Sequence, residues 1–186
     1  MTISTREATD ALNDIELAER RASRLRGYER GAPHFILWGL IWMVGYGLSD
    51  LDPPKAGLAW LVLDAIGMTG SFLISRAALA GASMARKGYG RRYAALGATG
   101  FAFIWAAYFV MQPHEMAQFG AFPALVMAGI YTAVGIWRGP RWAAAGVVLG
   151  LCTVAGFAIF KDHFMLWMAA AGGSTLLLTG LWLRRP

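Results

Sequence analysis

Cysteine and charged residues are scarce in this chain of 186 residues. The only cysteine, Cys152, excludes an intramolecular disulfide, and its apolar setting in LGLCTVAG argues against an activated thiolate. No nucleophile, base and orienting residue occur at a spacing that indicates a catalytic site. We therefore favour a protein that is not an enzyme. Catalysis stays open as an alternative, because the sites of intramembrane hydrolases assemble only in three dimensions.

Apolar residues dominate the composition instead. They make up 57% of the sequence, against 15% charged residues, and the chain also holds 8 Trp and 23 Gly, a balance typical of a polytopic helical membrane protein. Six apolar runs are each about as long as a helix needs to cross a hydrocarbon core roughly 30 Å thick. We predict an all-α fold with six transmembrane helices, arranged as three helical hairpins with short outside turns. The predicted spans are 33–50, 57–75, 94–112, 119–137, 142–160 and 164–183.

Residues 1–31 form a predicted cytoplasmic amphipathic helix, which precedes a six-helix transmembrane domain over residues 32–186. Ser4 and Glu7 have the spacing of a capping box, and acidic residues precede the arginines, which suits the helix dipole. Such a helix could lie on the membrane or on the protein's own loops, or residues 5–27 could dock a cytosolic partner or a neighbouring subunit. A narrow apolar stripe at three-four spacing consists of Ala8, Ala11, Ile15, Ala18, Ala22 and Leu25.

The distribution of Lys and Arg predicts the orientation in the membrane. Fifteen of the 17 lie in the amino-terminal segment, the second and fourth loops and the carboxyl-terminal tail, and only Lys55 and Lys161 fall on the other side. Short cytoplasmic loops carry the excess of Lys and Arg, so both termini are expected in the cytosol. The basic loop ends are expected to contact anionic lipid headgroups, and no nucleic acid is expected as a partner. The abundance of Ala, Gly and Arg favours a bacterial plasma membrane.

An aromatic row runs along the first predicted span. His34, Trp38, Trp42 and Tyr46 are four residues apart, so their side chains form one slowly turning stripe on a helix. Trp42 lies roughly 12 Å beyond His34, a depth that indicates helix packing or a lined cavity rather than interfacial anchoring. His34 could bind a haem or stack on a ligand, but a single histidine at the membrane edge is more often structural.

Asp64 is the only acid inside a predicted span, roughly 12 Å from the outer end of its helix. A carboxylate at that depth is costly and usually faces a helix-bundle interior or a watery cavity, which makes it a candidate site. It could bind a cation, relay a proton or pair with a substrate amine. The equally weighted alternative is a structural Asp, neutral or hydrogen-bonded to donors on a neighbouring helix. The candidate ligand-binding residues are Asp64, Trp38, Trp42, Tyr46, Trp60 and His34.

The predicted outside turns carry residue types that bind metals. His114 and Glu115 are adjacent rather than at ligand spacing such as HxxxH, so a divalent-metal site would require several turns to converge. Ordinary capping at the membrane interface is the favoured alternative, and we assign neither a metal nor a cofactor. The metal candidates that remain are His114, Glu115, Asp162 and His163, with Asp50 and Asp52 in the first turn.

Two classes of function remain open. The favoured one is a non-enzymatic regulator, sensor or scaffold whose six-helix body binds a lipid, an apolar ligand or a protein partner, and whose amino-terminal helix reports to the cytosol. The alternative is a small transporter or channel for a cation or organic amine that uses Asp64. Transporters usually show discontinuous helices or more than one buried charge, which disfavours the alternative. A homo-oligomer is a further hypothesis, since Gly146 and Gly150 have GxxxG spacing, although this signal is weak in a glycine-rich chain.

Overall fold

The computed structural model describes residues 5–80 and 89–185, and all regular structure in these two ranges is helical. The prediction of an all-α fold is therefore confirmed. Ser4 of the predicted capping box and the side chain of Ala8 lie outside the described part. The long helices are α1 (Thr5–Leu51), α2 (Ala56–Ala80), α3 (Tyr89–Met111), α4 (Met116–Arg138) and α5 (Pro140–Ile159). The last segment is made of α6 (Phe164–Trp167), η3 (Met168–Gly172) and α7 (Gly173–Leu183), and two short turns, η1 (Pro53–Lys55) and η2 (Lys161–His163), precede α2 and α6.

Five helical segments are long and apolar enough to cross a membrane, by length and composition. A sixth long helix, α3, contains a shorter apolar stretch, Ala98–Met111. Several apolar helices of this kind are the mark of an integral membrane protein. The five segments are Ala11–Leu51, Pro53–Ala78, Met116–Arg138, Pro140–Ile159 and Lys161–Leu183.

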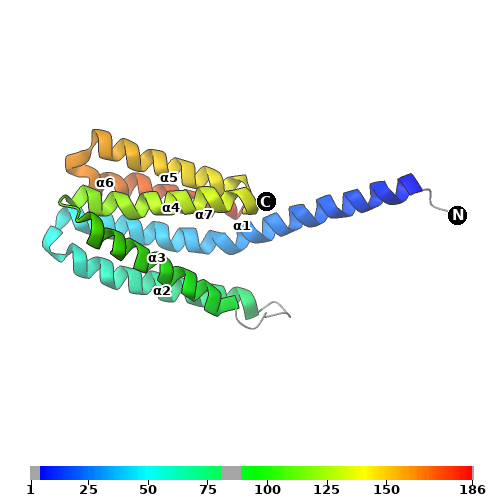
Figure 1. Ribbon diagram of the computed structural model, residues 1–186, viewed down its shortest axis with the longest axis horizontal. Coiled ribbons are helices and arrows are strands. Elements are labelled where there is room, and N and C mark those ends of the chain that lie inside the picture. Colours follow the sequence, from blue (N-terminus) through cyan, green and yellow to red (C-terminus); the bar gives the residue numbers. More distant parts are fainter. Residues whose placement is uncertain (1–4, 81–88, 186) are drawn as a thin grey trace.

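The helices run side by side as a bundle, with the turns after α1, α3 and α5 at one end (Figure 1). The tightest pairs are α4 with α5 and α1 with α7, and α2 packs mainly on α1. The α3 backbone stays further away, because large rings lie between it and α4, including Phe103, Tyr108 and Phe122. The prediction of three helical hairpins is therefore only partly right: α3 and α4 follow one another but are not closely packed partners.

Small residues explain why two of these pairs are so close. At Gly39 of α1, an added Cβ atom would lie 2.7 Å from the backbone nitrogen of Leu177 in α7. At Gly146 of α5, it would lie 2.5 Å from the carbonyl oxygen of Ala128 in α4. Backbones can approach this closely in a membrane bundle only where a side chain is absent. The Gly146 surface is thus used inside the chain, in contact with α4, rather than left free as a dimer face.

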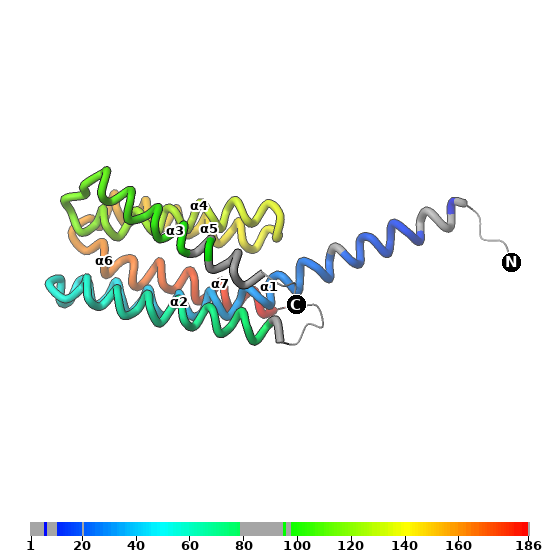
Figure 2. Tube along the Cα trace, turned by 60° about the horizontal axis from the view of Figure 1, so that its bottom comes forward, coloured from blue at the N-terminus to red at the C-terminus, as the bar shows by residue number. Residues whose placement is uncertain are grey.

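The first helix is a single rod, and it does not end at the predicted domain boundary between residues 31 and 32. Its outer half extends beyond the bundle, as both views show (Figures 1 and 2), and its side chains become buried from Tyr28 onward. Pro33 lies inside the helix, where proline removes one backbone hydrogen bond but the flanking turns are kept. The amino-terminal helix and the first predicted span are therefore one continuous element.

Candidate functional site

The aromatic row of α1 does not form one common surface. Trp38 turns to α2, where its Nε1 donates a hydrogen bond to Ser71 Oγ at 3.1 Å. Trp42 is buried and lies edge-on to Tyr46, with 5.5 Å between ring centroids. His34 is only partly buried, at the opposite end of the row. The drift of a four-residue step around the helix axis separates these side chains among different neighbouring helices.

Three of the candidate residues do come together, around Tyr46. The Tyr46 and Trp60 rings lie edge-to-face, 5.1 Å apart, and the Trp60 indole is fixed by a hydrogen bond from its Nε1 to Ser49 Oγ at 2.9 Å. Ser49 Oγ in turn donates to the carbonyl oxygen of Gly45 at 2.8 Å. Trp42, one turn before Tyr46 on α1, is the third ring of this cluster. Trp42, Tyr46 and Trp60 are therefore held in fixed orientations, and the first two are buried in the bundle.

A proline in α4 accounts for a polar pair beside this aromatic cluster. Pro123 has no backbone N–H, so the carbonyl oxygen of Phe119, four residues earlier, lacks its helical partner. The Tyr108 hydroxyl of α3 donates to that oxygen. The Tyr46 hydroxyl of α1 donates to the next carbonyl oxygen, that of Gly120, at 2.7 Å. In an apolar medium an unpaired carbonyl is costly, so Tyr108 supplies the donor that Pro123 lacks, while Tyr46 adds a second donor to the neighbouring carbonyl of Gly120.

Asp64 lies in the same region as these two hydroxyls. Its side chain is half-buried and close enough to Tyr46 and Tyr108 to interact with both electrostatically. Within the described residues it makes no hydrogen bond or ion pair. Both tyrosine hydrogens are already donated to α4, so the phenolic oxygens can only accept. An ionised Asp64 could therefore pair with a cation beside the aromatic rings, whereas a neutral Asp64 would leave the region without charge.

The sequence alone did not single out Tyr108. A signal was present, because Pro123 inside an apolar run implies a carbonyl group that needs a donor from another helix. Which helix would supply that donor depends on how α3 sits against α4, and no local pattern encodes this. Tyr108 also contacts the Phe119 ring, at 5.0 Å between centroids, which fixes its position on α4.

The metal candidates of the outside turns do not assemble into a site. Glu115 instead forms an ion pair with Lys161, at 2.7 Å between Oε2 and Nζ, and its side chain also takes part in a capping box with Gln118. His114, Asp162 and His163 are exposed nearby. Across residues 5–80 and 89–185, no group of three or more His, Cys, Asp or Glu is close enough to hold a metal ion. The turn before α4 and the turn before α6 do lie close together, but the positive charge that Glu115 contacts there is the ammonium group of Lys161.

At the other end of the bundle, Arg141 joins three helices. Its guanidinium lies over the Tyr28 ring of α1 at 5.1 Å and over the Trp182 ring of α7 at 5.4 Å. Its Nη1 also donates to the carbonyl oxygen of Arg185 at 2.6 Å, where α7 has ended and its carbonyls need donors.

The chain matches no family model, no curated protein and no solved structure.

Proposed function

We propose that the chain crosses the membrane six times, with α3 as the additional crossing and both termini in the cytosol. The uncharged part of α3, from Tyr93 to Met111, would extend roughly 28 Å at 1.5 Å per residue, close to the thickness of the hydrocarbon core. With six crossings, the lysine- and arginine-rich segments all fall on one side, as cytosolic loops require. The abundance of Ala, Gly and Arg remains our reason for proposing a bacterial plasma membrane.

We further propose that the protein is a non-enzymatic regulator or sensor, in which α1 carries conformational changes of the membrane bundle to the cytosol. The observation that supports this most directly is the continuity of α1, which is one helix from Thr5 to Leu51. A helix without a break moves as a rigid element, so a rotation or tilt at Trp42 is transmitted to its outer end.

The base of the projecting helix is firmly joined to the bundle, as such a mechanism requires. Tyr28 is only 5% exposed and contacts Arg141, which also binds the end of α7. Farther inward, α1 packs closely on α7 and on η3. Movements of α4, α5 or α7 relative to one another would therefore change the direction of α1.

The outer half of α1 offers a surface to a cytosolic partner through residues 5–27. Leu12 and Ile15 are 67% and 56% exposed, and Leu25 is also exposed, so the large apolar side chains described in this part of the helix are uncovered. Apolar residues at this spacing are recognised by grooves or helices of partner proteins. In the regulator hypothesis this surface changes position when the bundle binds its ligand.

Paired spin labels can test the rigid connection. With Cys152→Ser to remove the native thiol, labels at Leu12→Cys on α1 and Val147→Cys on α5 should give one narrow distance distribution. Gly27→Pro should broaden it, because a proline there removes the helical hydrogen bond to the Ser23 carbonyl, at a cost of about 3 kcal/mol. Pro33 is tolerated because it lies between Ala32 and Phe35, which the bundle buries, whereas residue 27 lies just outside that packed part. Gly27→Ala is the matched control, since an added Cβ there meets nothing within 4 Å. A broad distribution already in the parent protein would contradict the relay.

A second candidate function is transport or conduction of a cation or organic amine at Asp64. It is favoured by one observation: among the described residues the Asp64 carboxyl group has no hydrogen-bond or ion-pair partner, and it interacts electrostatically with Tyr46 and Tyr108. Carboxylates together with aromatic faces bind organic cations. The aromatic wall of such a site would be Tyr46 and Trp60, which lie edge-to-face.

Flux of tetraethylammonium and ethidium into proteoliposomes decides between the two functions. If the protein is a transporter, Asp64→Asn should lower flux about tenfold or more, the equivalent of at least 1.4 kcal/mol of lost cation binding. Asp52→Asn makes the same chemical change in the exposed first turn and should leave flux unchanged. Absence of flux in the parent protein, or flux that survives Asp64→Asn, would remove this candidate and leave the regulator.

A further inference from the structure

A pocket lies where α1 leaves the bundle, beside the turn between α4 and α5. Its volume is about 370 Å³. Gly139 forms its floor with a φ of +116°, a conformation that side chains disfavour. A Cβ atom there would collide with the Tyr28 hydroxyl and would lie 3.0 Å from Arg24 Cδ, so the Arg24 stem rests directly on the turn. The lining residues are Arg24, Gly135, Ile136, Trp137, Gly139, Pro140 and Ala143.

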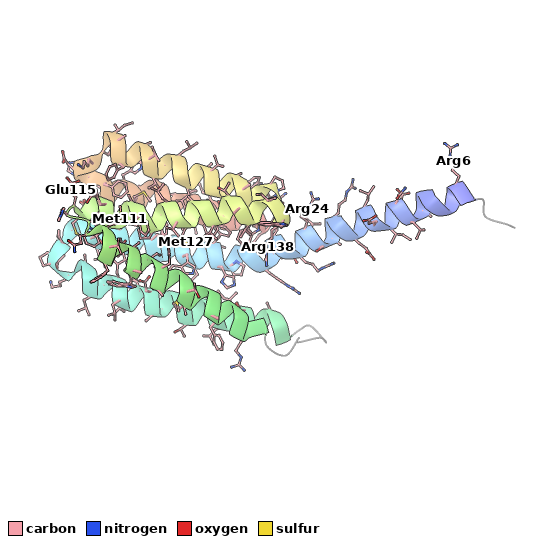
Figure 3. The ribbon with its side chains drawn as sticks, in the orientation of Figure 1. Arg6, Arg24, Met111, Glu115, Met127 and Arg138 are labelled. Atoms are coloured by element: carbon pink, nitrogen blue, oxygen red, sulfur yellow. The ribbon has the colours of Figure 1, made fainter. Side chains whose placement is uncertain are left out.

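The pocket carries the positive charge of Arg24. Arg24 is exposed, and within the described part of the chain it makes no hydrogen bond or ion pair. No acidic residue lines the pocket. Arg138 lies at the same end of the bundle, with its guanidinium 5.8 Å from the Trp142 ring centroid, and Figure 3 shows it near Arg24. A guanidinium in this setting is suited to an anion, and its planar fork matches phosphate oxygens.

One flank of the pocket is apolar and uncovered. Ile136 and Trp137 are 77% and 80% exposed, at the last turn of α4. Tryptophan at the end of a membrane-crossing helix typically lies at headgroup level. A ligand that fills this pocket therefore meets a cation on one side and a hydrocarbon-like surface on the other. A free phosphate would use only the first of these features.

We propose that this pocket binds the phosphate headgroup of an anionic phospholipid, with the acyl chains lying along Ile136 and Trp137. This inference rests on the proposed function and names the ligand class of the sensor. Arg24 belongs to the projecting half of α1, whereas the pocket floor belongs to the α4–α5 turn. A headgroup held between them would fix the angle at which α1 leaves the bundle. The lipid composition of the membrane would thereby set the position of the cytosolic helix.

Native mass spectrometry of the full chain, titrated with dioleoylphosphatidylglycerol in neutral detergent, tests the site. Arg24→Gln should weaken the tightest bound anionic lipid about tenfold, the loss of one charge-assisted contact. Arg24→Lys, which keeps the charge, should retain most of the affinity. Arg26→Gln is the matched control, because it removes the same charge from an exposed position about 200° around the helix and should change affinity less than about twofold. Equal weakening by Arg24→Gln and Arg26→Gln would mean diffuse attraction to the surface and would overturn the proposal.

Competition experiments distinguish a phospholipid headgroup from a soluble phosphate as the ligand of the pocket. Inorganic phosphate and glycerol 3-phosphate at millimolar concentration should not displace the lipid, because they lack the acyl chains that contact Trp137. Displacement that depends on Arg24 would show that the pocket binds a soluble phosphate, and it would overturn the proposal of a lipid ligand. Binding of dioleoylphosphatidylcholine with the same affinity would also overturn it. These results are independent of the spin-label distances, so a failed lipid site and a failed relay are told apart.

Discussion

Replacing Gly146 with alanine is expected to lower the free energy of unfolding by about 2 to 3 kcal/mol, the cost of forcing atoms into a closely packed site. The added methyl group would meet the Ala128 carbonyl oxygen and the Thr132 nitrogen, each 2.5 Å away. Both are backbone atoms of α4, so neither can move without displacing the helix. The two helices must separate, and contacts along their whole length weaken.

The matched control is Gly150→Ala, one turn further along α5. Its nearest neighbour would be the Ala128 Cβ at 3.5 Å, an ordinary van der Waals distance. Alanine is favoured over glycine inside a helix by about 1 kcal/mol, so this variant is expected to be neutral or slightly more stable. Unfolding in mixed micelles with increasing sodium dodecyl sulfate measures both. Equal destabilisation, or a change of oligomeric state in both variants, would instead indicate that the GxxxG pattern forms a contact between chains.

The second large effect is expected at Tyr108. Tyr108→Phe should cost about 1 to 2 kcal/mol, because the Phe119 carbonyl oxygen is left without a donor in an apolar setting. In a Pro123→Ala background the cost should fall below about 0.5 kcal/mol, since residue 123 then supplies the missing helical N–H. The difference between the two costs is the coupling energy between Tyr108 and Pro123. Unfolding of the four proteins of this double-mutant cycle gives that energy.

Tyr46→Phe is the control for this cycle. The Tyr46 hydroxyl donates to Gly120, whose carbonyl oxygen is not the one deprived of a partner by Pro123. Its loss is therefore expected to cost a similar amount in both backgrounds. If Pro123→Ala were to rescue Tyr46→Phe and not Tyr108→Phe, the assignment of the two tyrosines would be wrong.

The sequence predicted the helical class and the apolar segments because both depend on composition along the chain. It predicted the pairing of helices only in part. The contact between α4 and α5 depends on Gly135 and Gly146, which are only two of 23 glycines. Glycine at a helix crossing and glycine facing lipid look alike in a sequence. Gly129, whose added Cβ would meet nothing within 4 Å, is an example of the second kind.

The candidate site was predicted in part. Asp64, Tyr46 and Trp60 were named from depth and residue type, and these residues do lie in one region. Trp38 was predicted as part of the same candidate site, but its indole donates a hydrogen bond to Ser71 of α2 instead. A step of four residues leaves a rotation of about 40°, and over two or three steps this decides which neighbouring helix a side chain meets. Such rotations are set by packing against other helices, so they cannot be derived from one helix alone.

The length of α1 has an electrostatic consequence. From Tyr28, where burial begins, to Thr5 the helix extends about 35 Å, and Glu19 already stands roughly 13 Å out. Counterions at physiological ionic strength screen a charged surface over about 8 Å. On the proposed topology, Arg24, Arg26 and Arg30 would lie inside the negative layer of the leaflet and outnumber Glu29 there, while the acidic residues from Glu19 outward would extend beyond its reach. The order of charges along α1 would thus let one helix be attracted at its base without being repelled at its tip.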